Sequence, residues 1–222
     1  KMNEIKNKGF IRTHRKGPTS IGKTLEDLLG IKENCISGPD IGNVELKSAR
    51  IGSQSMLTLT TKSPDIRGAN SWLRDNYGYK TPESMLLNPN LNILHTTVNG
   101  VKYNTILGEE AFKIVFDENL MKLVHKRDGE TKVYWSLDKI KDAFNAKYPV
   151  EQLFYVKAKS EFRGGVEFFH YTEAYHLQHF SAEKLLSHIQ DGIIDIDIRI
   201  GIRTKGKLKG RSHDHGTGIR IK

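Results

Sequence analysis

Two carboxylates and a lysine stand close together in PDIGNVELK, at residues 39–47. Alternate side chains of a strand point to opposite faces, so a strand here would place Glu45 and Lys47 together on one face. A turn before the strand can bring the Asp40 carboxylate back beside Glu45. Two neighbouring carboxylates repel each other, and a hard divalent cation such as Mg²⁺ relieves that repulsion.

Such a constellation suits hydrolysis of a phosphodiester. Mg²⁺ held by Asp40 and Glu45 would polarise the phosphate, lower the pKa of an attacking water and stabilise charge on the leaving oxygen. Lys47 would orient the water or offset the charge that develops on phosphorus. Glu26, in a predicted helix upstream, is a candidate fourth member. The same spacing also arises by chance, and Glu and Lys on one strand face are commonly a solvated edge, so spacing alone leaves catalysis open.

The elements that must position these residues follow from hydrophobic periodicity. Helices are expected at 19–30, 69–77, 136–147 and 181–190, and strands at 43–50, 55–62, 92–98, 101–107, 112–117, 120–126, 131–135, 152–161 and 166–172. The dipeptides Asn99-Gly100 and Asp128-Gly129 are typical of tight hairpin turns. The sequence therefore predicts an α/β fold of the mixed α+β kind, with a core sheet flanked by helices.

The stretch 194–202 has the clearest strand pattern in the chain. Isoleucine occupies every second place, so all five isoleucines face one side. The opposite face carries Asp195, Asp197 and Arg199, followed by Arg203. A buried isoleucine face would hold this polar face firmly, as a rigid recognition surface requires.

The polar face of this strand has the chemistry needed to read C/G-rich DNA. Arg can donate two hydrogen bonds to guanine O6 and N7, and Asp can accept one from cytosine N4. Asp197 and Arg199 share the face, so they would read neighbouring bases from a fixed platform. The alternative is that they form an ordinary surface ion pair, which is worth little energetically.

The C-terminal segment adds further donors and acceptors. His213, Asp214, His215 and Arg220 could contact base edges, whereas four flexible cations are better suited to phosphates: Lys205, Lys207, Lys209 and Arg211. His-x-His beside an acid also suits zinc. No further Cys or His lies close enough in sequence to complete a zinc site.

Positive charge gathers at both ends of the chain. The net charge is +9 over 222 residues; residues 1–24 carry +6, residues 203–222 carry another +6, and the stretch between them carries −3. Two basic ends around a mildly acidic middle would suit a polyanion held between two walls. The alternative is that Lys-rich termini only aid solubility.

Composition excludes some other classes of protein. The single cysteine, Cys35, allows no intramolecular disulfide and suits a reducing compartment. No apolar run approaches the roughly 18 residues that would span a bilayer, so no membrane partner is expected. The chain begins at Lys1, which would fit a processed product or one module of a longer protein.

The chain resembles the MvaI/BcnI family of monomeric type II restriction endonucleases, which are relatives of the mismatch-repair nicking enzyme MutH. The resemblance rests on ordered blocks along nearly the whole chain: RKGPTSIGKTLEDLLG (15–30), PDIGNVELK (39–47), SMLTLTTKSPDIRGAN (55–70), VYWS (133–136) and DIDIRIG through SHDHGTGIR (195–220). These blocks together are far more specific than the carboxylate pattern.

The resemblance implies one two-lobed endonuclease domain over residues 1–222 that grips duplex DNA. The catalytic lobe, mainly N-terminal, would contain a restriction-endonuclease-like core sheet, and the recognition lobe would be mainly C-terminal. The resemblance also implies a monomer in the cytoplasm of a prokaryotic cell, which cuts one strand and then turns round to cut the other.

The resemblance assigns roles to the residues already singled out. In the family, the set matched here by Asp40, Glu45 and Lys47, with Glu26 as the helical glutamate, binds Mg²⁺ and leaves 5′-phosphates. The segment 213–215 and Arg220 match positions that contact base edges. Relatives recognise CCWGG or CCSGG, so a CCNGG-type site, CCWGG-like, is expected, with the central base pair left open.

Two alternatives to a double-strand endonuclease follow from the same residues. One is a strand-nicking enzyme of the MutH kind, against which the HDHGT block at 213–217 argues. The other is a DNA-binding module without catalysis. The complete set of Asp40, Glu45 and Lys47 argues against a non-catalytic module, because a site that has lost its activity has no need of the lysine.

Overall fold

The computed structural model describes residues 1–32 and 38–222, so Cys35 lies outside the described residues. The chain divides into two compact units. Unit 1 comprises Lys1–Ser55 and Phe144–Ser181, and unit 2 comprises Met56–Ala143 and Ala182–Lys222. Both units therefore combine segments that are far apart in the sequence. Among the described residues, none of the helices has the length and apolar character needed to cross a bilayer.

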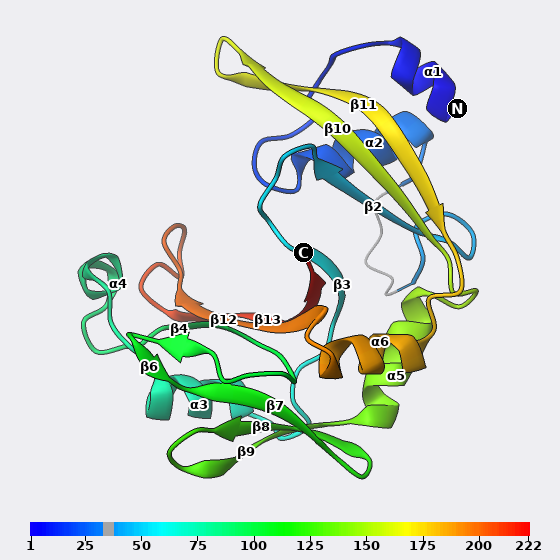
Figure 1. The fold of residues 1–222 in the computed structure, drawn as a ribbon. Helices are drawn as coiled ribbons and strands as arrows, with labels where there is room; N and C mark the ends of the chain where they lie inside the picture. Colours follow the sequence, from blue (N-terminus) through cyan, green and yellow to red (C-terminus); the bar gives the residue numbers. More distant parts are fainter. Residues whose placement is uncertain (33–37) are drawn as a thin grey trace. The chain divides into compact units, whose positions relative to one another are not determined.

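Unit 1 is built on a four-stranded sheet in the order β1-β11-β10-β2 (Figure 1). β2 pairs with β10 in parallel, and the other neighbours are antiparallel. Its elements are α1 (Met2–Asn7), β1 (Ile11–Arg12), α2 (Ser20–Leu29), β2 (Glu45–Arg50), β10 (Leu153–Arg163) and β11 (Val166–Leu177).

The core of unit 1 lies between α2 and one face of this sheet. Ile21 and Leu25, one helical turn apart, pack in a buried cluster with Leu46 of β2 and Val156 of β10. α2 ends at Gly30, which adopts the left-handed conformation (φ 81°) that glycine takes without steric cost. The helix predicted at 19–30 is confirmed. Because Leu46 faces this core, its neighbours in β2 must face the other side of the sheet.

Unit 2 contains a four-stranded antiparallel sheet in the order β3-β13-β12-β4, a three-stranded sheet β7-β8-β9 and the pair β5-β6. Its elements are β3 (Leu57–Thr61), α3 (Ala69–Tyr77), α4 (Pro82–Leu87), β4 (Leu94–Val98), β5 (Thr105–Ile106), β6 (Glu109–Glu110), β7 (Phe112–Asp117), β8 (Leu120–His125), β9 (Gly129–Ser136), α6 (Ala182–Gln190), β12 (Ile194–Ile202) and β13 (Ser212–Ile221). The remaining helix, α5 (Leu137–Lys147), contains the division between the two units. The mixed α+β class predicted from the sequence is confirmed.

The isoleucine strand is the centre of unit 2. The five alternating isoleucines of β12 are all buried, and α3, α4 and α6 contact this strand. The predicted isoleucine face is therefore confirmed. The opposite, charged face of β12 is less exposed to solvent than the sequence predicts: Asp195 is only 4% exposed and Asp197 is fully buried.

One hairpin predicted from the sequence is wrong. β4 pairs with β12 instead of with the chain that follows Asn99-Gly100. The N–H of Gly100 donates to Ile189 O, and a Cβ at Gly100 would lie 2.6 Å from Gln190 O, so this glycine allows close packing against the end of α6. The strand expected at 101–107 shrinks to β5. By contrast, Asp128-Gly129 joins β8 to β9, as predicted.

Candidate active site and DNA-reading surface

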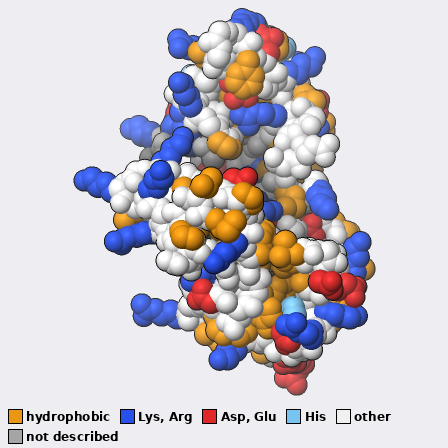
Figure 2. Space-filling view, turned by 90° about the vertical axis from the view of Figure 1, so that its left-hand side faces the viewer, with side chains coloured by type: hydrophobic (Ala, Val, Ile, Leu, Met, Phe, Trp, Pro, Cys, Tyr) orange, Lys and Arg blue, Asp and Glu red, His pale blue; other side chains and the backbone are white. Residues whose placement is uncertain are grey.

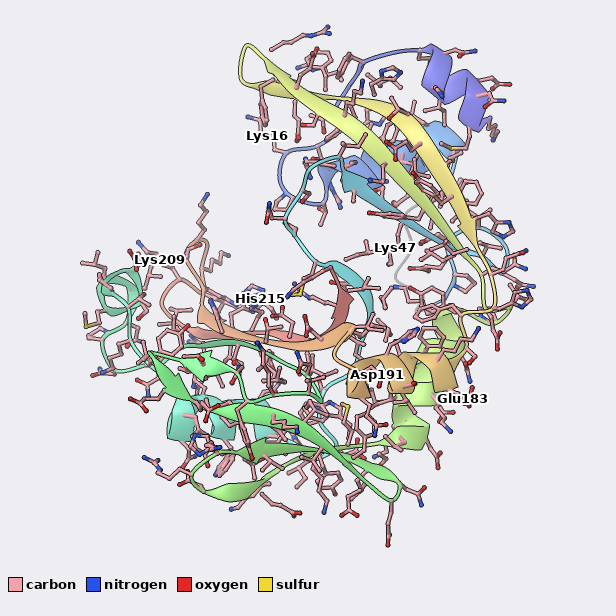
Figure 3. All side chains as sticks on the ribbon, viewed as in Figure 1. Lys16, Lys47, Glu183, Asp191, Lys209 and His215 are labelled. Carbon is pink, nitrogen blue, oxygen red and sulfur yellow. The ribbon has the colours of Figure 1, made fainter. Side chains whose placement is uncertain are left out.

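Asp40, Glu45 and Lys47 come together at the start of β2. Lys47 Nζ donates to Glu45 Oε1 at 2.6 Å, and the N–H of Leu46 donates to Asp40 Oδ2 at 3.0 Å. The strand alternation predicted from the sequence thus places one carboxylate and one ammonium side by side. Figure 3 labels Lys47 on this strand.

A tight turn returns Asp40 to the strand. Ile41 and Val44 exchange two backbone hydrogen bonds of 3.0 and 2.9 Å, and Gly42 between them has a φ of 58°. Glycine adopts that left-handed conformation without the Cβ clash that other residues meet. The turn leaves the Asp40 carboxylate where it accepts the Leu46 N–H and interacts electrostatically with Glu45.

Glu45 is a buried carboxylate, with 1% of its surface exposed. Its Oε1 accepts from Lys47 and forms a second ion pair with Lys147 Nζ, at 3.1 Å. Its Oε2 is buried and has no hydrogen-bond partner among the described residues. Burial raises the pKa of Glu45, and Asp40 raises it further, whereas the two lysines oppose the shift. A bare, buried carboxylate oxygen beside a second carboxylate is a fitting place for a cation.

Lys47 shares this low-dielectric environment. Its side chain is 19% exposed. Burial lowers the pKa of Lys47 and the nearby charge of Lys147 adds to that effect, whereas Glu45 and Asp40 raise it. The ammonium therefore gives up a proton more easily than a lysine in water does.

The far end of α5 completes the surroundings of Glu45, a feature that sequence reasoning missed. Lys147 is the last residue of α5, and Tyr148 follows it, 1% exposed and stacked on Phe144 at 4.5 Å between ring centroids. Burial raises the pKa of Tyr148, with Glu45 and Asp40 adding to the effect. The helix was predicted, but no local signal tells which strand its end will cover.

Glu26 approaches β2 from the α2 side. Its Oε1 would lie 3.8 Å from a Cβ placed on Gly22, and Ser48 Oγ would lie 3.6 Å from the same point. Ser48 shares the face of β2 that packs on α2, whereas Glu45 and Lys47 point to the opposite face. The structure thus brings Asp40, Glu45 and Lys47 together. Glu26 lies on the opposite side of β2 from Glu45 and Lys47.

In unit 2, Asp197 lies under two arginines. Arg199 donates to Asp197 Oδ2 through Nε at 2.9 Å, and its Nη2 forms an ion pair with Oδ1 at 2.8 Å. Arg220 Nη1 lies 3.0 Å from the same Oδ2. Thr97 Oγ1 donates to Oδ1 at 2.8 Å. Both carboxylate oxygens are thus engaged within the protein, so Asp197 fixes the direction of two guanidinium groups.

The two arginine side chains remain partly accessible. The side chains of Arg199 and Arg220 are 36% and 29% exposed. A Cβ at Gly218 would lie 2.6 Å from Arg220 Nε, so the glycine leaves the space that this guanidinium occupies. The alternative of a surface ion pair describes Arg199 only in part, because its carboxylate partner is wholly buried.

Three histidines extend this surface. The rings of His213 and His215 lie 4.0 Å apart, and a Cβ at Gly201 would lie 3.3 Å from His95 Nε2 and 3.9 Å from His215 Nε2. Burial lowers the pKa of His95, as do Arg199 and His215. Burial and His215 also lower the pKa of His213. His95, which the sequence did not single out, is paired with Arg199 across β4 and β12.

Asp214 makes two internal hydrogen bonds. Its Oδ2 accepts from Asn70 Nδ2 of α3 at 2.8 Å, and its Oδ1 accepts from the N–H of Gly216 at 2.7 Å. These bonds fix the start of β13 to α3. Asp214 is nevertheless exposed, as is His215 beside it.

The four predicted phosphate-binding cations lie on or beside the β12–β13 loop. All four are exposed: Lys205, Lys207, Lys209 and Arg211. Asn88, at the end of α4, donates to Gly210 O at 2.9 Å and ties the loop to the helix. Figure 3 labels Lys209 on the loop and His215 on β13. Figure 2 shows many Lys and Arg side chains standing out on the face that it displays.

Comparison with known proteins identifies the chain. The sequence model of the MvaI/BcnI restriction endonuclease family matches residues 1–222. The chain belongs to this family. As an MvaI/BcnI-type enzyme, it is a type II site-specific deoxyribonuclease and a DNA-binding hydrolase. No curated protein matches the chain.

Two solved structures of restriction endonuclease MvaI are similar to this family member. The complex of MvaI with its cognate DNA substrate is 35% identical, with a TM-score of 0.86, and covers 99% of this chain and 89% of the MvaI chain. The structure of MvaI without DNA is 34% identical over the same shares, with a TM-score of 0.56. The restriction-endonuclease fold expected from the resemblance is confirmed.

The carboxylates of this endonuclease fit a cation that keeps much of its own water. Among the described residues, no three His, Cys, Asp or Glu side chains form a group that could hold a metal ion. Asp40 and Glu45, which interact electrostatically, would leave most positions around a cation to water, and Mg²⁺ is an ion that retains several waters. In the same part of the chain, the zinc alternative for His213 and His215 lacks a third side-chain ligand.

Proposed function

We propose that this endonuclease hydrolyses a phosphodiester of duplex DNA with Mg²⁺ held by Asp40 and Glu45. The observation that carries the proposal is the buried Oε2 of Glu45, which lacks a hydrogen-bond partner among the described residues and is influenced by the charge of Asp40. Restriction endonucleases generally use a divalent metal ion. Mg²⁺ bound here would supply Lewis-acid activation of the phosphate and of water.

The residues around the carboxylates have complementary tasks in this proposal. Lys47, within 2.6 Å of Glu45, orients the attacking water and offsets charge on phosphorus. Lys147 holds Glu45 in place, and the buried Tyr148 excludes water from one side. The attacking water gives up a proton as it adds to phosphorus, the bond from phosphorus to the 3′ oxygen breaks, and that oxygen takes up a proton. The products therefore carry 5′-phosphates.

For Glu26 we propose a supporting role in catalysis. Its carboxylate comes from α2, on the opposite side of β2 from Glu45 and Lys47, and near Ser48. From there it acts on the active site through the position and charge balance of the strand.

We further propose that the surface of unit 2 reads a CCNGG-type, CCWGG-like site. Arg199 and Arg220, both aimed by Asp197, have the fork of donors that guanine O6 and N7 accept. His213 and His215, whose imidazoles each offer one donor and one acceptor when neutral, supply further contacts to base edges. Asp214 lies exposed between them.

The basic loop completes the proposed grip on DNA. Its cations hold phosphates and set position without specifying sequence: Lys205, Lys207, Lys209 and Arg211. We propose that the enzyme acts as a monomer; since the described residues offer one Asp40–Glu45–Lys47 set per chain, a monomer would cut the two strands one at a time.

Digestion of a supercoiled plasmid with a single CCWGG sequence tests this function. With Mg²⁺, we expect nicked circles first and linear DNA later, with fragment ends that map inside CCWGG and carry 5′-phosphates. EDTA should abolish cleavage, and a plasmid that lacks CCNGG sequences should stay intact. Cleavage outside such sites would contradict the proposed specificity. Nicked circles that never become linear would support the MutH-like alternative instead.

A further inference from the structure

A second basic feature of the chain lies in unit 1, away from the proposed active site. A pocket of about 680 Å³ opens between the segment at residues 12–18 and the β10–β11 hairpin. Three exposed cations line it: Arg12, Arg15 and Lys16. They belong to the N-terminal basic stretch, for which the proposed active site and DNA-reading surface have no use. Figure 3 labels Lys16.

Arg50 and Glu167, which also line the pocket, form an ion pair with each other. Arg50 Nε and Nη2 donate to the two oxygens of Glu167 at 2.6 and 2.8 Å. Arg50 Nη1 also donates to Pro18 O at 3.1 Å, and Ser20 Oγ accepts from Arg50 Nη2 at 3.0 Å. Because Arg50 and Glu167 neutralise each other, the positive charge of the pocket comes from its rim.

The segment that carries the rim is held in place at several points. The N–H of Thr13 donates to Glu167 O at 2.9 Å, and the N–H of His14 donates to Thr24 Oγ1 at 3.1 Å. The His14 ring contacts Asp27 of α2 at 2.8 Å. The cations thus project from a fixed backbone, which lowers the entropy lost when they bind a ligand.

One wall of the pocket is apolar. Phe162, near the tip of the β10–β11 hairpin, is 70% exposed, and Val166 and Pro18 lie along the same pocket. A cationic rim beside an exposed aromatic ring matches a chain of alternating phosphates and deoxyriboses better than it matches a free anion. We propose that this pocket binds the sugar-phosphate backbone of duplex DNA, with the phosphate at Arg12 and Lys16 and a sugar against Phe162. The inference rests on DNA binding by the family and not on the proposed cleavage residues.

Equilibrium binding of a matched pair of double variants tests the pocket. Arg12→Ala with Lys16→Ala removes two rim charges, and Lys8→Ala with Lys159→Ala removes two exposed charges that do not line it. Affinities are measured with EDTA present, for a CCWGG duplex and an unrelated duplex, between about 50 and 200 mM salt. The rim variant, Arg12→Ala with Lys16→Ala, should bind both duplexes more weakly by the same factor, about tenfold at low salt. The slope of log affinity against log salt concentration should decrease by about one to two, which corresponds to the loss of one to two phosphate contacts.

Each other outcome overturns the inference. If the rim variant binds like the control variant, the pocket does not contact DNA. If it loses affinity for the CCWGG duplex alone, the residues read sequence and do not hold the backbone. Phe162→Ala should weaken DNA binding severalfold and leave the salt dependence of the affinity unchanged. If the affinity does not change, Phe162 does not contact a sugar. Thermal unfolding of every variant separates these results from a folding defect, and cleavage by the rim variant at saturating DNA should continue.

Discussion

Replacing Lys47 with alanine is expected to slow DNA cleavage by about 10²–10³-fold, with little change in DNA affinity. The ammonium lies 2.6 Å from Glu45 Oε1, in a site where burial lowers the pKa of Lys47. Its charge therefore acts in a low dielectric, where its loss is felt most strongly in the transition state. Single-turnover cleavage of the plasmid, together with duplex binding in EDTA, measures the two effects separately.

Lys147→Ala is the matched control. Lys147 Nζ lies 3.1 Å from the same oxygen of Glu45, but its side chain is more exposed, at 31% against 19% for Lys47. Its loss leaves Lys47 in place, so we expect a reduction of about tenfold or less. Full activity in the Lys47 variant would show that Lys47 has no role in catalysis. A larger loss of activity in the Lys147 variant than in the Lys47 variant would assign the proposed role to Lys147 instead.

Asp197→Asn should lower sequence discrimination strongly. Asp197 is fully buried and directs the guanidinium groups of Arg199 and Arg220. A bidentate contact between arginine and guanine contributes about 1–3 kcal/mol of discrimination, so one misplaced arginine costs about 5–150-fold. The ratio of affinities for a CCWGG duplex and an unrelated duplex, measured in EDTA, reports this loss.

Asp195→Asn provides the control for burial on the same strand. Asp195 is 4% exposed and lies near Asn99 and Lys222, at 3.1 and 3.9 Å. Both variants replace a buried carboxylate of β12, so both should lose stability, but only Asp197→Asn should lose discrimination. If both variants retain the affinity ratio of the wild type, the arginines do not read bases from the position that Asp197 gives them.

Local periodicity was enough to predict β2, α2 and β12, but it did not predict β13, the strand that carries the two histidines and Arg220. The isoleucine alternation located β12, and the apolar spacing in α2 located the helix that packs on β2. The same alternation put Glu45 and Lys47 on one face, and the structure has them in contact. These inferences succeed because each depends only on neighbours in sequence.

The contacts that sequence reasoning missed all come from distant segments. Lys147 and Tyr148 reach Glu45 from the end of α5, and His95 reaches Arg199 through the pairing of β4 with β12. That pairing also explains the mistaken hairpin at Asn99-Gly100: a central strand needs two neighbours, and β12 takes β4 as one of them. Tertiary pairing thus overrode a strong local turn preference.

The burial of Asp197 has a related cause. Alternation correctly assigned it to the polar face of β12, but the strand lies between β13 and β4, whose side chains cover that face. Arg220 from β13 and Thr97 from β4 converge on the carboxylate. Asp197 therefore lies inside the protein, where it orients Arg199 and Arg220. The partly exposed hydrogen-bond donors at this position belong to these two arginines.

Anomalous scattering from Mn²⁺ in crystals of the enzyme with a CCWGG duplex would show whether Asp40 and Glu45 hold the metal ion. Mn²⁺ takes oxygen ligands as Mg²⁺ does, and its position can be assigned without ambiguity. We expect a peak bonded to carboxylate oxygens of Asp40 and Glu45, with Lys47 beside it and a backbone phosphate within reach. A peak at His213 and His215, or cleavage in the crystal with no ion at the two carboxylates, would contradict the proposed metal site.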